Sequence, residues 1–415
     1  MIVGVIGSGG REHAICEQLK RSKKVNKIYC FPGNAGTFKI ADNVNIDINN
    51  FEIFKDYILK NKIGLVVVGP EKPLVDGLVD YLQKFKIKVF GPNKLASQLE
   101  GSKIFTKKIC EKYNIPSAKF GVFHNIDDAN NFLKSSSHPI VIKADNLASG
   151  KGVYICDNFE ESSKAVKEVF EGKFGKTNKV LIEEFLKGEE MSFFIISDGI
   201  SIQNFGTAQD HKRVLEGDKG KNTGGMGAYS PSRLINDELE KKILNKIINP
   251  TIKGLSDLGS VYKGFLYAGL MIINNEPYLI EYNVRMGDPE TEVVIPRIKS
   301  DLLNLLKGIK DGTFSEKDLN VNDEVAATVM LTSSGYPEKY STGYEISGVE
   351  DVDCSIVFHA GTKFENDKLI TCGGRVMSIT SFGKTKEVAL KNSYESVSKI
   401  NFKGKYYRTD IGFDL

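Results

Sequence analysis

Short apolar runs alternate with helically spaced apolar positions along the first 100 residues of the chain. Five apolar runs predict strands, at positions 2–6, 27–30, 44–46, 65–68 and 87–90. Stretches between or after them predict helices, near positions 11–20, 51–60, 74–84 and 94–99. Strands that alternate with helices are typical of a doubly wound parallel sheet. In the usual strand order 3-2-1-4-5, ligands gather at the carboxyl ends of strands 1 and 4.

Glycine-rich turns follow three of these strands, at 7–12, 31–37 and 69–71. The first turn is not a dinucleotide-binding fingerprint, because Glu12 stands where that motif requires glycine. The second strand also ends in Cys30, Phe31 and Pro32 rather than in an acid that could hold a ribose. A glycine turn before a helix N-terminus is still an anion site, and Arg11 beside it suits a phosphate. A tight turn without a ligand is the alternative.

A second unit begins near residue 102 and contains a strand at 139–143 that ends in lysine. A loop of small residues follows at 144–152, before another strand at 153–156. Backbone N–H groups of such a loop can close on phosphates, while Lys143 and Lys151 neutralise their charge. The spacing is not that of a Walker loop, and an exposed hairpin would look much the same.

Three later segments offer polar groups to a ligand or form solvated loops. In the segment 180–190, backbone groups at Glu184 and Leu186 suit an adenine edge, and Glu190 suits two ribose hydroxyls. The segment 209–213 offers a carboxylate for an ammonium group and cations for a phosphate, from Asp210, Lys212 and Arg213. The third segment is the glycine-containing loop 222–231.

The stretch from Leu279 to Glu290 carries the most functional information in the chain. Apolar and polar residues alternate at its start, as in a strand with one buried and one solvated face. The alternation places Glu281, Asn283 and Arg285 on one face. Oxygen ligands suit Mg²⁺ shared with phosphates, and the planar guanidinium suits a carboxylate or phosphate. A solvated strand face with ordinary polar residues is the alternative, and the abrupt polar turn at 287–290 favours the functional interpretation.

The last hundred residues predict a mixed α+β domain. Strands are expected at 325–331, 356–359, 369–371 and 375–380, followed by a helix at 384–399. We therefore expect three domains: an α/β substrate-binding domain at 1–101, a central unit at 102–319 with a small lid at about 115–190, and the α+β domain at 320–415. The last domain is expected to close the substrate cleft.

Composition excludes several classes of protein. The 415 residues are 41% hydrophobic and 26% charged, with a formal net charge of +3, which argues against a nucleic-acid-binding surface. No apolar run reaches the length of a transmembrane helix, and the chain opens directly on a strand rather than on a basic leader. Its six cysteines and five histidines are scattered, so we expect reduced thiols, a cytoplasmic location and no zinc site.

These motifs, in this order, resemble an ATP-grasp nucleotide site: a lysine at a strand end, a glycine loop, a Glu-Glu-Phe-Leu-x-Gly-Glu-Glu hinge and a Glu-x-Asn strand. A fuller set of blocks resembles the phosphoribosylamine–glycine ligase family, also called glycinamide ribonucleotide synthetases. The blocks lie at 9–14, 32–37, 68–74, 99–103, 209–213, 222–231, 287–291, 359–363 and 373–376. The likeness spans nearly the whole chain, with no room for the further domains that some relatives carry.

The resemblance implies an enzyme of purine biosynthesis that joins glycine to 5-phosphoribosylamine and hydrolyses ATP to ADP and phosphate. It also implies Mg²⁺ or Mn²⁺ at Glu281 and Asn283. Implied nucleotide contacts are Lys143, Ser149, Gly150, Lys151, Glu183, Glu184, Phe185, Leu186 and Glu190. Small-molecule substrates are expected as partners, with no nucleic acid or membrane, and a transient contact with the enzyme that supplies phosphoribosylamine is allowed.

Substrate contacts rest more on charge than on the resemblance. Arg285 and Asp210 are the candidates for the carboxylate and the ammonium of glycine and, with Lys143, for the catalytic residues. The further candidates for substrate binding are Gly9, Gly10, Arg11, Asn34, Glu71, Lys212, Arg213, Gly224, Gly225 and Asp288. Transfer of the γ-phosphate of ATP is expected to convert glycine to glycyl phosphate, the acyl phosphate intermediate. Because glycyl phosphate would hydrolyse in water, the mechanism requires a closing lid but no Ser or Cys nucleophile.

One position departs from the wider ATP-grasp pattern. Many members carry a first metal-binding acid twelve residues before the Glu of Glu-x-Asn, where this chain has Gly269. Either one metal dominates, or Asp288 or Glu290 helps to hold a second. Other ATP-grasp carboxylate–amine ligases, a nicotinamide-dependent dehydrogenase and a non-catalytic nucleotide sensor are the alternative functions. Glu12 and the missing ribose acid argue against the dehydrogenase, and the intact charged residues argue against the sensor.

Overall fold

The computed structural model describes residues 1–147, 152–175, 177–314 and 319–414. Its N-terminal part is a parallel five-stranded sheet in the order β3-β2-β1-β4-β5, so the predicted strand order is confirmed. The strands are β1 Ile2–Gly7, β2 Lys27–Pro32, β3 Asp42–Asn43, β4 Leu65–Val68 and β5 Val89–Phe90. Both faces of this sheet are covered, because positions 3–6 of β1 are all buried.

Helices pack around this sheet and connect its strands. They are α1 Gly10–Lys20, the 3₁₀ turn η1 Thr37–Lys39, α2 Phe51–Lys60, α3 Glu71–Asp76, α4 Leu78–Gln83 and α5 Gln98–Gly101. The single helix predicted at 74–84 is divided in two, because Gly77 adopts a φ of +95° between α3 and α4. The third strand, β3, lies at 42–43 rather than at the predicted 44–46. Its pairing with β2 starts at Asp42, and the backbone N–H of Val44 donates to the carbonyl of Cys30 just after the strand ends.

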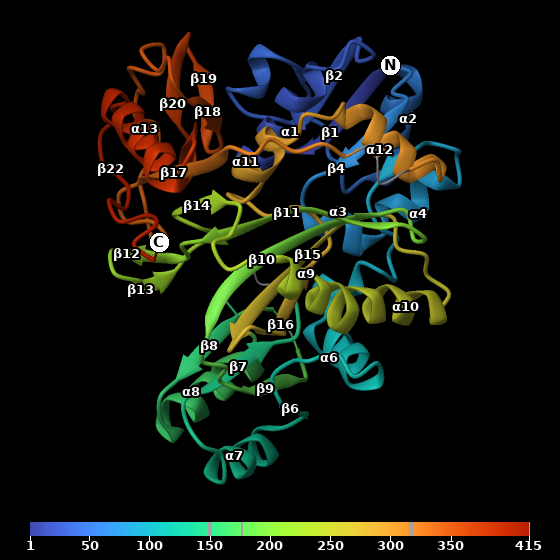
Figure 1. The fold of residues 1–415 in the computed structure, drawn as a ribbon, viewed down its shortest axis with the longest axis vertical. Coiled ribbons are helices and arrows are strands. Elements are labelled where there is room, and N and C mark those ends of the chain that lie inside the picture. Colours follow the sequence, from blue (N-terminus) through green and yellow to red (C-terminus); the bar gives the residue numbers. More distant parts are fainter. Residues whose placement is uncertain (148–151, 176, 315–318, 415) are drawn as a thin grey trace.

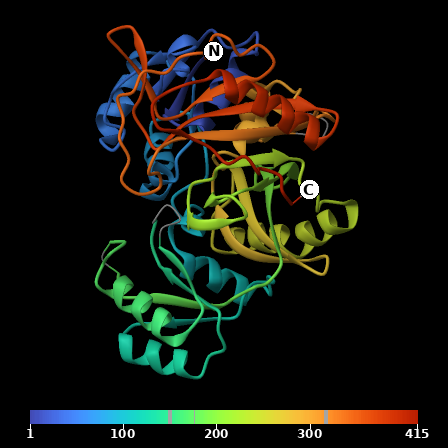
Figure 2. The same cartoon turned by 90° about the vertical axis from the view of Figure 1, so that its left-hand side faces the viewer.

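A small subdomain projects from the body of the molecule, at the bottom of Figure 1. Its four-stranded sheet has the order β6-β9-β7-β8 and its own buried core. Its elements, with the helix α6 that leads into it, are α6 Lys103–Lys112, β6 Phe120–Phe123, α7 Ile126–Lys134, β7 Ile140–Ala144, β8 Val153–Cys156, α8 Phe159–Phe170 and β9 Val180–Glu184. Asn125 and Asn158 cap α7 and α8 by accepting backbone N–H groups, which defines where each helix begins. Figure 2 shows the same projection from the side.

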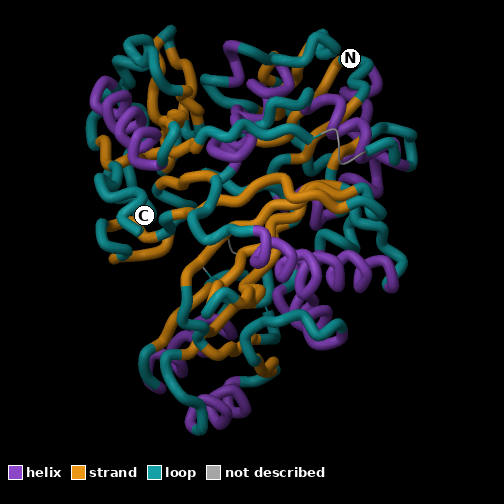
Figure 3. The backbone as a smooth tube through the Cα atoms, in the orientation of Figure 1, coloured by secondary structure: helices purple, strands orange, loops and turns teal. Residues whose placement is uncertain are grey.

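A large antiparallel sheet forms the centre of the molecule and continues into the C-terminal part. Its path is β16-β15-β10-β11-β14-β17-β21-β18, with β22 paired to β17. The central elements are β10 Glu189–Ser197, β11 Ile202–Asp210, β12 Arg213–Leu215, β13 Lys219–Asn222, β14 Gly227–Ser230, α9 Asp237–Ile243, the π-helical turn η2 Leu244–Ile248, α10 Asn249–Asp257, β15 Gly264–Ile273, β16 Glu276–Asn283, α11 Thr291–Val294, the 3₁₀ turn η3 Ile295–Arg297 and α12 Leu302–Asp311. Figure 3 shows these strands running through the middle of the fold.

The C-terminal elements lie beside the N-terminal sheet, in the upper left of Figure 1. They are β17 Val325–Ser333, β18 Ile356–His359, β19 Thr362–Glu365, β20 Lys368–Thr371, β21 Arg375–Gly383, α13 Lys386–Lys399 and β22 Lys405–Tyr406. Since β14 pairs with β17, one sheet runs across the expected boundary at residue 320. In the described part of the chain, no helix is long and apolar enough to cross a membrane.

Candidate active site

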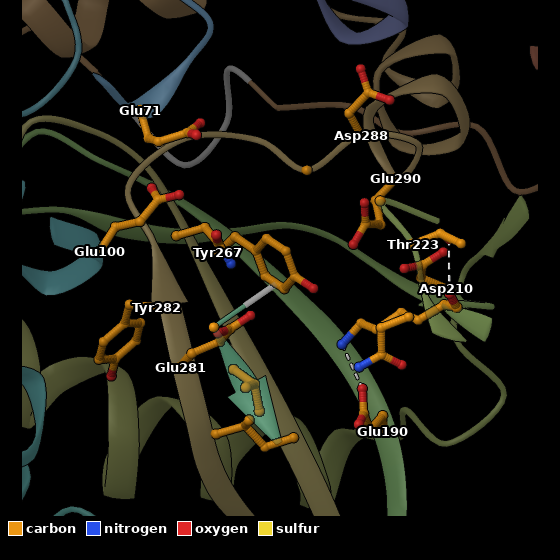
Figure 4. A pocket seen from close by; sticks show the side chains of 18 of the residues that line it. Glu71, Glu100, Glu190, Asp210, Thr223, Tyr267, Glu281, Tyr282, Asp288 and Glu290 are labelled. Carbon is orange, nitrogen blue, oxygen red and sulfur yellow. Dashed lines mark hydrogen bonds and ion pairs between the residues drawn. The ribbon is translucent and has the colours of Figure 1, made fainter. Parts of the chain in front are cut away.

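A single large cavity, of about 1200 Å³, opens between the small subdomain and the body of the molecule. Every part of the fold contributes to its walls: the glycine turn after β1, the strands of the small subdomain, β16, and Tyr336 and Arg375 of the C-terminal part. Figure 4 shows Glu281 near its centre, with Glu71 and Glu100 on one side and Asp210 and Glu290 on the other. The cavity therefore gathers the motifs that are scattered along the sequence.

The polar face of β16 forms one wall of this cavity. Glu281, Asn283 and Arg285 all line it, and Tyr282 and Val284 between them are buried. Burial thus alternates over 281–285 as predicted, but Ile280 and Tyr282 also reach the cavity, and β16 ends at Asn283, so Arg285 lies just beyond the strand. Across the sheet, Glu281 pairs with Gly269 of β15 and Asn283 with Tyr267. Gly269 therefore lies beside the Glu281 carboxylate but adds no second acid to it.

The chemistry of this face fits a hard divalent cation. Within the described ranges, neither the Glu281 carboxylate nor the Asn283 amide has a hydrogen bond or ion pair of its own. No group of three or more His, Cys, Asp or Glu side chains in those ranges could hold a metal. Two oxygen ligands with room for phosphates and waters are what Mg²⁺ commonly uses. Asp288, in contrast, is already engaged, since Arg375 and the backbone N–H of Arg11 contact its two oxygens at 3.0 and 3.1 Å.

Arg285 is held between two acids from the N-terminal part. Its Nη2 donates to Glu100 Oε1 at 2.7 Å, and its Nε lies 3.4 Å from Glu71 Oε2. Burial tends to raise the pKa of Glu71, but the Arg285 and Arg11 charges lower it overall. For Glu100, burial outweighs the Arg285 charge and raises the pKa to about 7. Glu100 also accepts the backbone N–H of Val284 at 2.8 Å, so it fixes both the strand end and the guanidinium.

We expect Glu100 to make the stability of the protein depend on pH. Its pKa is about 7 in the folded state against an ordinary 4.5, so the stabilisation from its proton is complete below 4.5 and is lost as the pH rises through 7. The free energy of unfolding of the wild type, relative to Glu100→Gln, should therefore fall by about 2 kcal/mol between about pH 5 and about pH 7.5. Urea titrations of both proteins at each pH measure this difference. A difference that is the same at both pH values would contradict it.

The nucleotide side of the cavity contains a chain of buried charges. Lys143 Nζ donates to Glu183 Oε2 at 2.9 Å, and Lys107 Nζ lies 3.5 Å from Glu183 Oε1. Lys103 also lines the cavity, and its Nζ donates to the carbonyl of Asn146 at 3.1 Å. Burial lowers the pKa of Lys103 and of Lys107. Three lysines with one carboxylate leave an excess of positive charge, which suits a polyphosphate.

Lys103 and Lys107 were not among the residues predicted from the sequence. Lys103 ends the block Leu-Glu-Gly-Ser-Lys, which contributed to the family resemblance without a role of its own. Both lysines lie on α6, and only the packing of α6 against the small subdomain brings Lys107 to Glu183 and Lys103 to the carbonyl of Asn146. The spacing of the 99–103 block was the one signal that could have indicated Lys103.

The hinge after β9 also lines the cavity, with Glu184, Phe185, Leu186 and Glu190. The backbone N–H of Glu184 donates to the carbonyl of Lys119. In the described part of the chain, the backbone of Leu186 makes no hydrogen bond, so its N–H and C=O can meet a base edge. Glu190 Oε2 accepts from Lys212 Nζ at 2.6 Å, and the Lys212 charge lowers the pKa of Glu190. Ser149, Gly150 and Lys151 lie outside the described residues.

Two neighbouring acids, half-buried Asp210 and buried Glu290, lie on the far side of Glu281 (Figure 4). Burial, and then the neighbouring Glu290, raise the pKa of Asp210 well above its usual range. Asp210 Oδ1 is buried without a hydrogen-bond partner, and Glu290 Oε1 lies 3.4 Å from Ser192 Oγ. Two neighbouring acids with a buried, unpartnered oxygen form a site that an ammonium group would complete.

The structure brings only part of the N-terminal glycine turn to the cavity. Gly9 and Arg11 line it, but the Arg11 guanidinium is bound to Glu12 and to the carbonyl of Met286. Glu12 also accepts the backbone N–H of Gly9, and so caps α1 where a phosphate was expected.

Asn34 and Gly10, expected to contact the ribose phosphate, do not line the cavity. The Asn34 amide donates to the carbonyls of Ser8 and His359 at 2.9 and 2.7 Å, and its Oδ1 accepts two backbone N–H groups. A Cβ on Gly10 would lie 2.2 Å from Glu292 Oε1, so this glycine permits a close approach to α11. The two residues shape the turn and join it to its neighbours.

A loop and a C-terminal arginine meet beside Asp288. Lys212, Arg213 and Gly224 line the cavity, whereas Gly225 lies behind it with a φ of +113°. A Cβ on Gly225 would clash with Pro289 and Asp210, so glycine is required there. Arg375 of β21 donates to the carbonyls of Gly224 and Asp288. The sequence predicted no role for Arg375, although its block 373–376 contributed to the resemblance.

Comparison with protein families shows a similarity to phosphoribosylglycinamide synthetases over nearly the whole chain. Residues 1–100 match the N domain of phosphoribosylglycinamide synthetase, residues 101–291 its ATP-grasp (A) domain and residues 326–414 its C domain. The phosphoribosylamine–glycine ligase of Clostridium acetobutylicum is 46% identical, over 99% of this chain and 99% of that protein. The crystal structure of the Thermotoga maritima phosphoribosylamine–glycine ligase is 35% identical, with a TM-score of 0.88 over 99% of this chain and 100% of that one.

A more distant likeness shows the fold alone. The biotin carboxylase domain of Hydrogenobacter thermophilus 2-oxoglutarate carboxylase, solved with MgADP and bicarbonate, is 17% identical. Its TM-score is 0.74, over 98% of this chain and 91% of that one.

Proposed function

The chain belongs to the phosphoribosylglycinamide synthetase family of ATP-grasp enzymes and has glycinamide ribonucleotide synthetase activity in purine biosynthesis; from this premise we propose how its residues perform the reaction. The substrates are ATP, glycine and 5-phosphoribosylamine, and the products are glycinamide ribonucleotide, ADP and phosphate. We propose that the chain forms three functional units, at 1–101, 102–319 and 320–415, and that residues at about 115–190 act as the lid. We also propose that the enzyme is cytoplasmic.

ATP binds between the lid and β16. Leu186 meets the adenine edge with its backbone N–H and C=O, and Glu190 accepts the ribose hydroxyls. Lys143, Lys103 and Lys107 lie where the phosphates need positive charge. Glu281 and Asn283 would hold Mg²⁺ or Mn²⁺, which supplies charge neutralisation at the phosphates when bound. Such an ion needs oxygen ligands that are not already bound to other groups. The Glu281 carboxylate and the Asn283 amide meet this need, because neither has a hydrogen bond or ion pair within the described ranges.

Glycine binds next to the position of the γ-phosphate of ATP. The free N–H groups of Arg285 bind its carboxylate, and the Asp210–Glu290 pair binds its ammonium group. Phosphoribosylamine binds toward the part of the cavity wall that contains Gly9, Glu71 and Asp288, which come from three separate segments. The observation that carries this proposal is that Glu281 and Asn283 of β16, and Arg285 just after its end, all line the same cavity, which brings a carboxylate binder close to the residues that would hold the metal.

The reaction then needs alignment more than covalent help. A carboxylate oxygen of glycine attacks the γ-phosphorus of ATP, the bond to the β-phosphate oxygen breaks, and ADP leaves. The amine of phosphoribosylamine attacks the acyl carbon of glycyl phosphate, phosphate leaves, and the amine loses a proton. The buried lysines stabilise the charge that builds on the transferred group. Closure of the lid excludes the water that would otherwise hydrolyse the acyl phosphate.

An isotope experiment tests the acyl phosphate. Glycine labelled with ¹⁸O in its carboxylate should transfer one labelled oxygen to the inorganic phosphate, because that oxygen bridges carbon and phosphorus in the intermediate. Mass spectrometry of the released phosphate measures the transfer, and ADP should be the only nucleotide product. Label in AMP, or unlabelled phosphate, would contradict this mechanism while leaving the ligase activity untouched.

A further inference from the structure

The segment 411–414 of the C-terminal part lies against the end of β11, where Asp210 is the last residue of the strand and Lys212 follows in the next loop. Figure 1 shows this end of the chain beside the hairpin of β12 and β13. The stretch 209–212 and Asp414 both line the cavity, and within this stretch it is Gln209 and His211 that contact Asp414. Contacts to Gln209 and His211 therefore hold the backbone on both sides of Asp210 and directly before Lys212.

One carboxylate, that of Asp414, makes most of these contacts. Its Oδ1 lies 3.0 Å from His211 Nε2, and its Oδ2 accepts from Gln209 Nε2 at 3.1 Å and from the Tyr229 hydroxyl at 3.0 Å. Tyr229 is on β14, where it pairs directly with Gln209 across the sheet. The carboxylate thus joins both residues that flank Asp210 to the neighbouring strand.

The segment also encloses the imidazole of His211. The ring of Phe413 meets it edge-on, with centroids 5.6 Å apart, and the backbone nitrogen of Gly412 lies 3.0 Å from Nε2. His211 is buried, with 3% of its surface exposed, so no water replaces these contacts. Burial tends to raise the pKa of Asp414, but its hydrogen bonds to His211 and Tyr229 lower it to about 2, so the carboxylate stays charged.

We propose that Asp414 is a positioning residue for the ligase reaction, which holds the stretch 209–213 so that Asp210 and Lys212 face the substrates. This inference rests on the proposed function of Asp210 as the ammonium binder of glycine. Without the carboxylate, Gln209 and His211 lose a shared acceptor, and the strand end that carries Asp210 is released. Small displacements of a binding group are costly to catalysis even when the fold is intact.

A neighbouring acid provides a matched control. Asp410 accepts from Arg408 at 2.7 and 2.9 Å and from the backbone N–H of Gly217, but it has no contact with 209–211. Asp410→Asn therefore removes the charged partner of buried Arg408 directly before the segment 411–414. It leaves the Asp414 carboxylate and its contacts with Gln209 and His211 in place. A purely structural role of the segment would make Asp410→Asn and Asp414→Asn equivalent.

Steady-state kinetics of the full chain separate these roles. We expect Asp414→Ala to raise the KM for glycine by about 10- to 100-fold. The KM for ATP should change much less, and Asp414→Asn, which keeps an acceptor oxygen, should lie between Asp414→Ala and the wild type. Asp410→Asn should keep the wild-type KM for glycine. Equal KM values for glycine in Asp414→Ala and the wild type, at matched folding by circular dichroism, would overturn the proposal.

A double mutant distinguishes this proposal from the function on which it rests. If Asp414 acts through Asp210, then adding Asp414→Ala to Asp210→Asn should raise the KM for glycine little beyond the single Asp210→Asn. Fully multiplicative effects would overturn the positioning role. An Asp210→Asn variant with the wild-type KM for glycine would instead contradict the assignment of Asp210, whatever Asp414 does.

Discussion

Glu281→Gln is expected to lower kcat at least about 100-fold while leaving the fold intact, because an isosteric amide keeps the volume but loses the charge that would bind Mg²⁺. The carboxylate lines the cavity and has no ion pair within the described ranges that the substitution would break. Titration of activity against Mg²⁺ measures the effect, and partial recovery at high Mg²⁺ is expected.

Glu276→Gln is the matched control for this substitution. It lies at the other end of the same strand, β16, and its carboxylate pairs with Lys242 and Lys246 at 2.9 and 2.6 Å on the surface. Surface ion pairs contribute little to stability, so this variant should be fully active. Normal turnover of Glu281→Gln at ordinary Mg²⁺ would exclude Glu281 as a metal ligand.

Arg285→Lys is expected to raise the KM for glycine about 100-fold, because lysine keeps the charge but loses the planar fork that binds a carboxylate. Lysine also avoids leaving Glu71 and Glu100 without a cation, which removal of the charge would do. The KM for ATP should stay close to that of the wild type. Initial rates at varied glycine, with ATP saturating, measure this change.

Arg297→Lys controls for the loss of a buried guanidinium. Arg297 is buried and donates to the carbonyls of Glu324 and Asn322 and to Ser230 Oγ, outside the cavity. It should lose thermal stability without a change in the KM for glycine. A wild-type KM for glycine in Arg285→Lys would show that the carboxylate binds elsewhere, with Arg375 as the next cation to test.

The strand order of the N-terminal sheet and the polar face of β16 were predictable from local patterns. Side chains alternate across a strand because the backbone geometry of each residue requires it, so the common face of Glu281 and Asn283 needs no distant contact. Arg285 lies beyond the strand, and Glu71 and Glu100 hold it in place. The order of glycine turns and charged blocks along the chain likewise indicated a nucleotide-binding ligase before any contact was known.

The tertiary structure alone decided which of these groups are free to bind a substrate. Arg11 and Asp288 are 277 positions apart, yet their contact, with Glu12 capping α1, occupies the turn where a phosphate was expected. Lys103 and Arg375 reach the cavity only through packing between domains. Burial and charged neighbours, which determine the pKa of Glu100 and of Asp210, come from residues far apart in the chain. Local periodicity therefore determines the direction of a side chain, whereas its environment depends on the assembled fold.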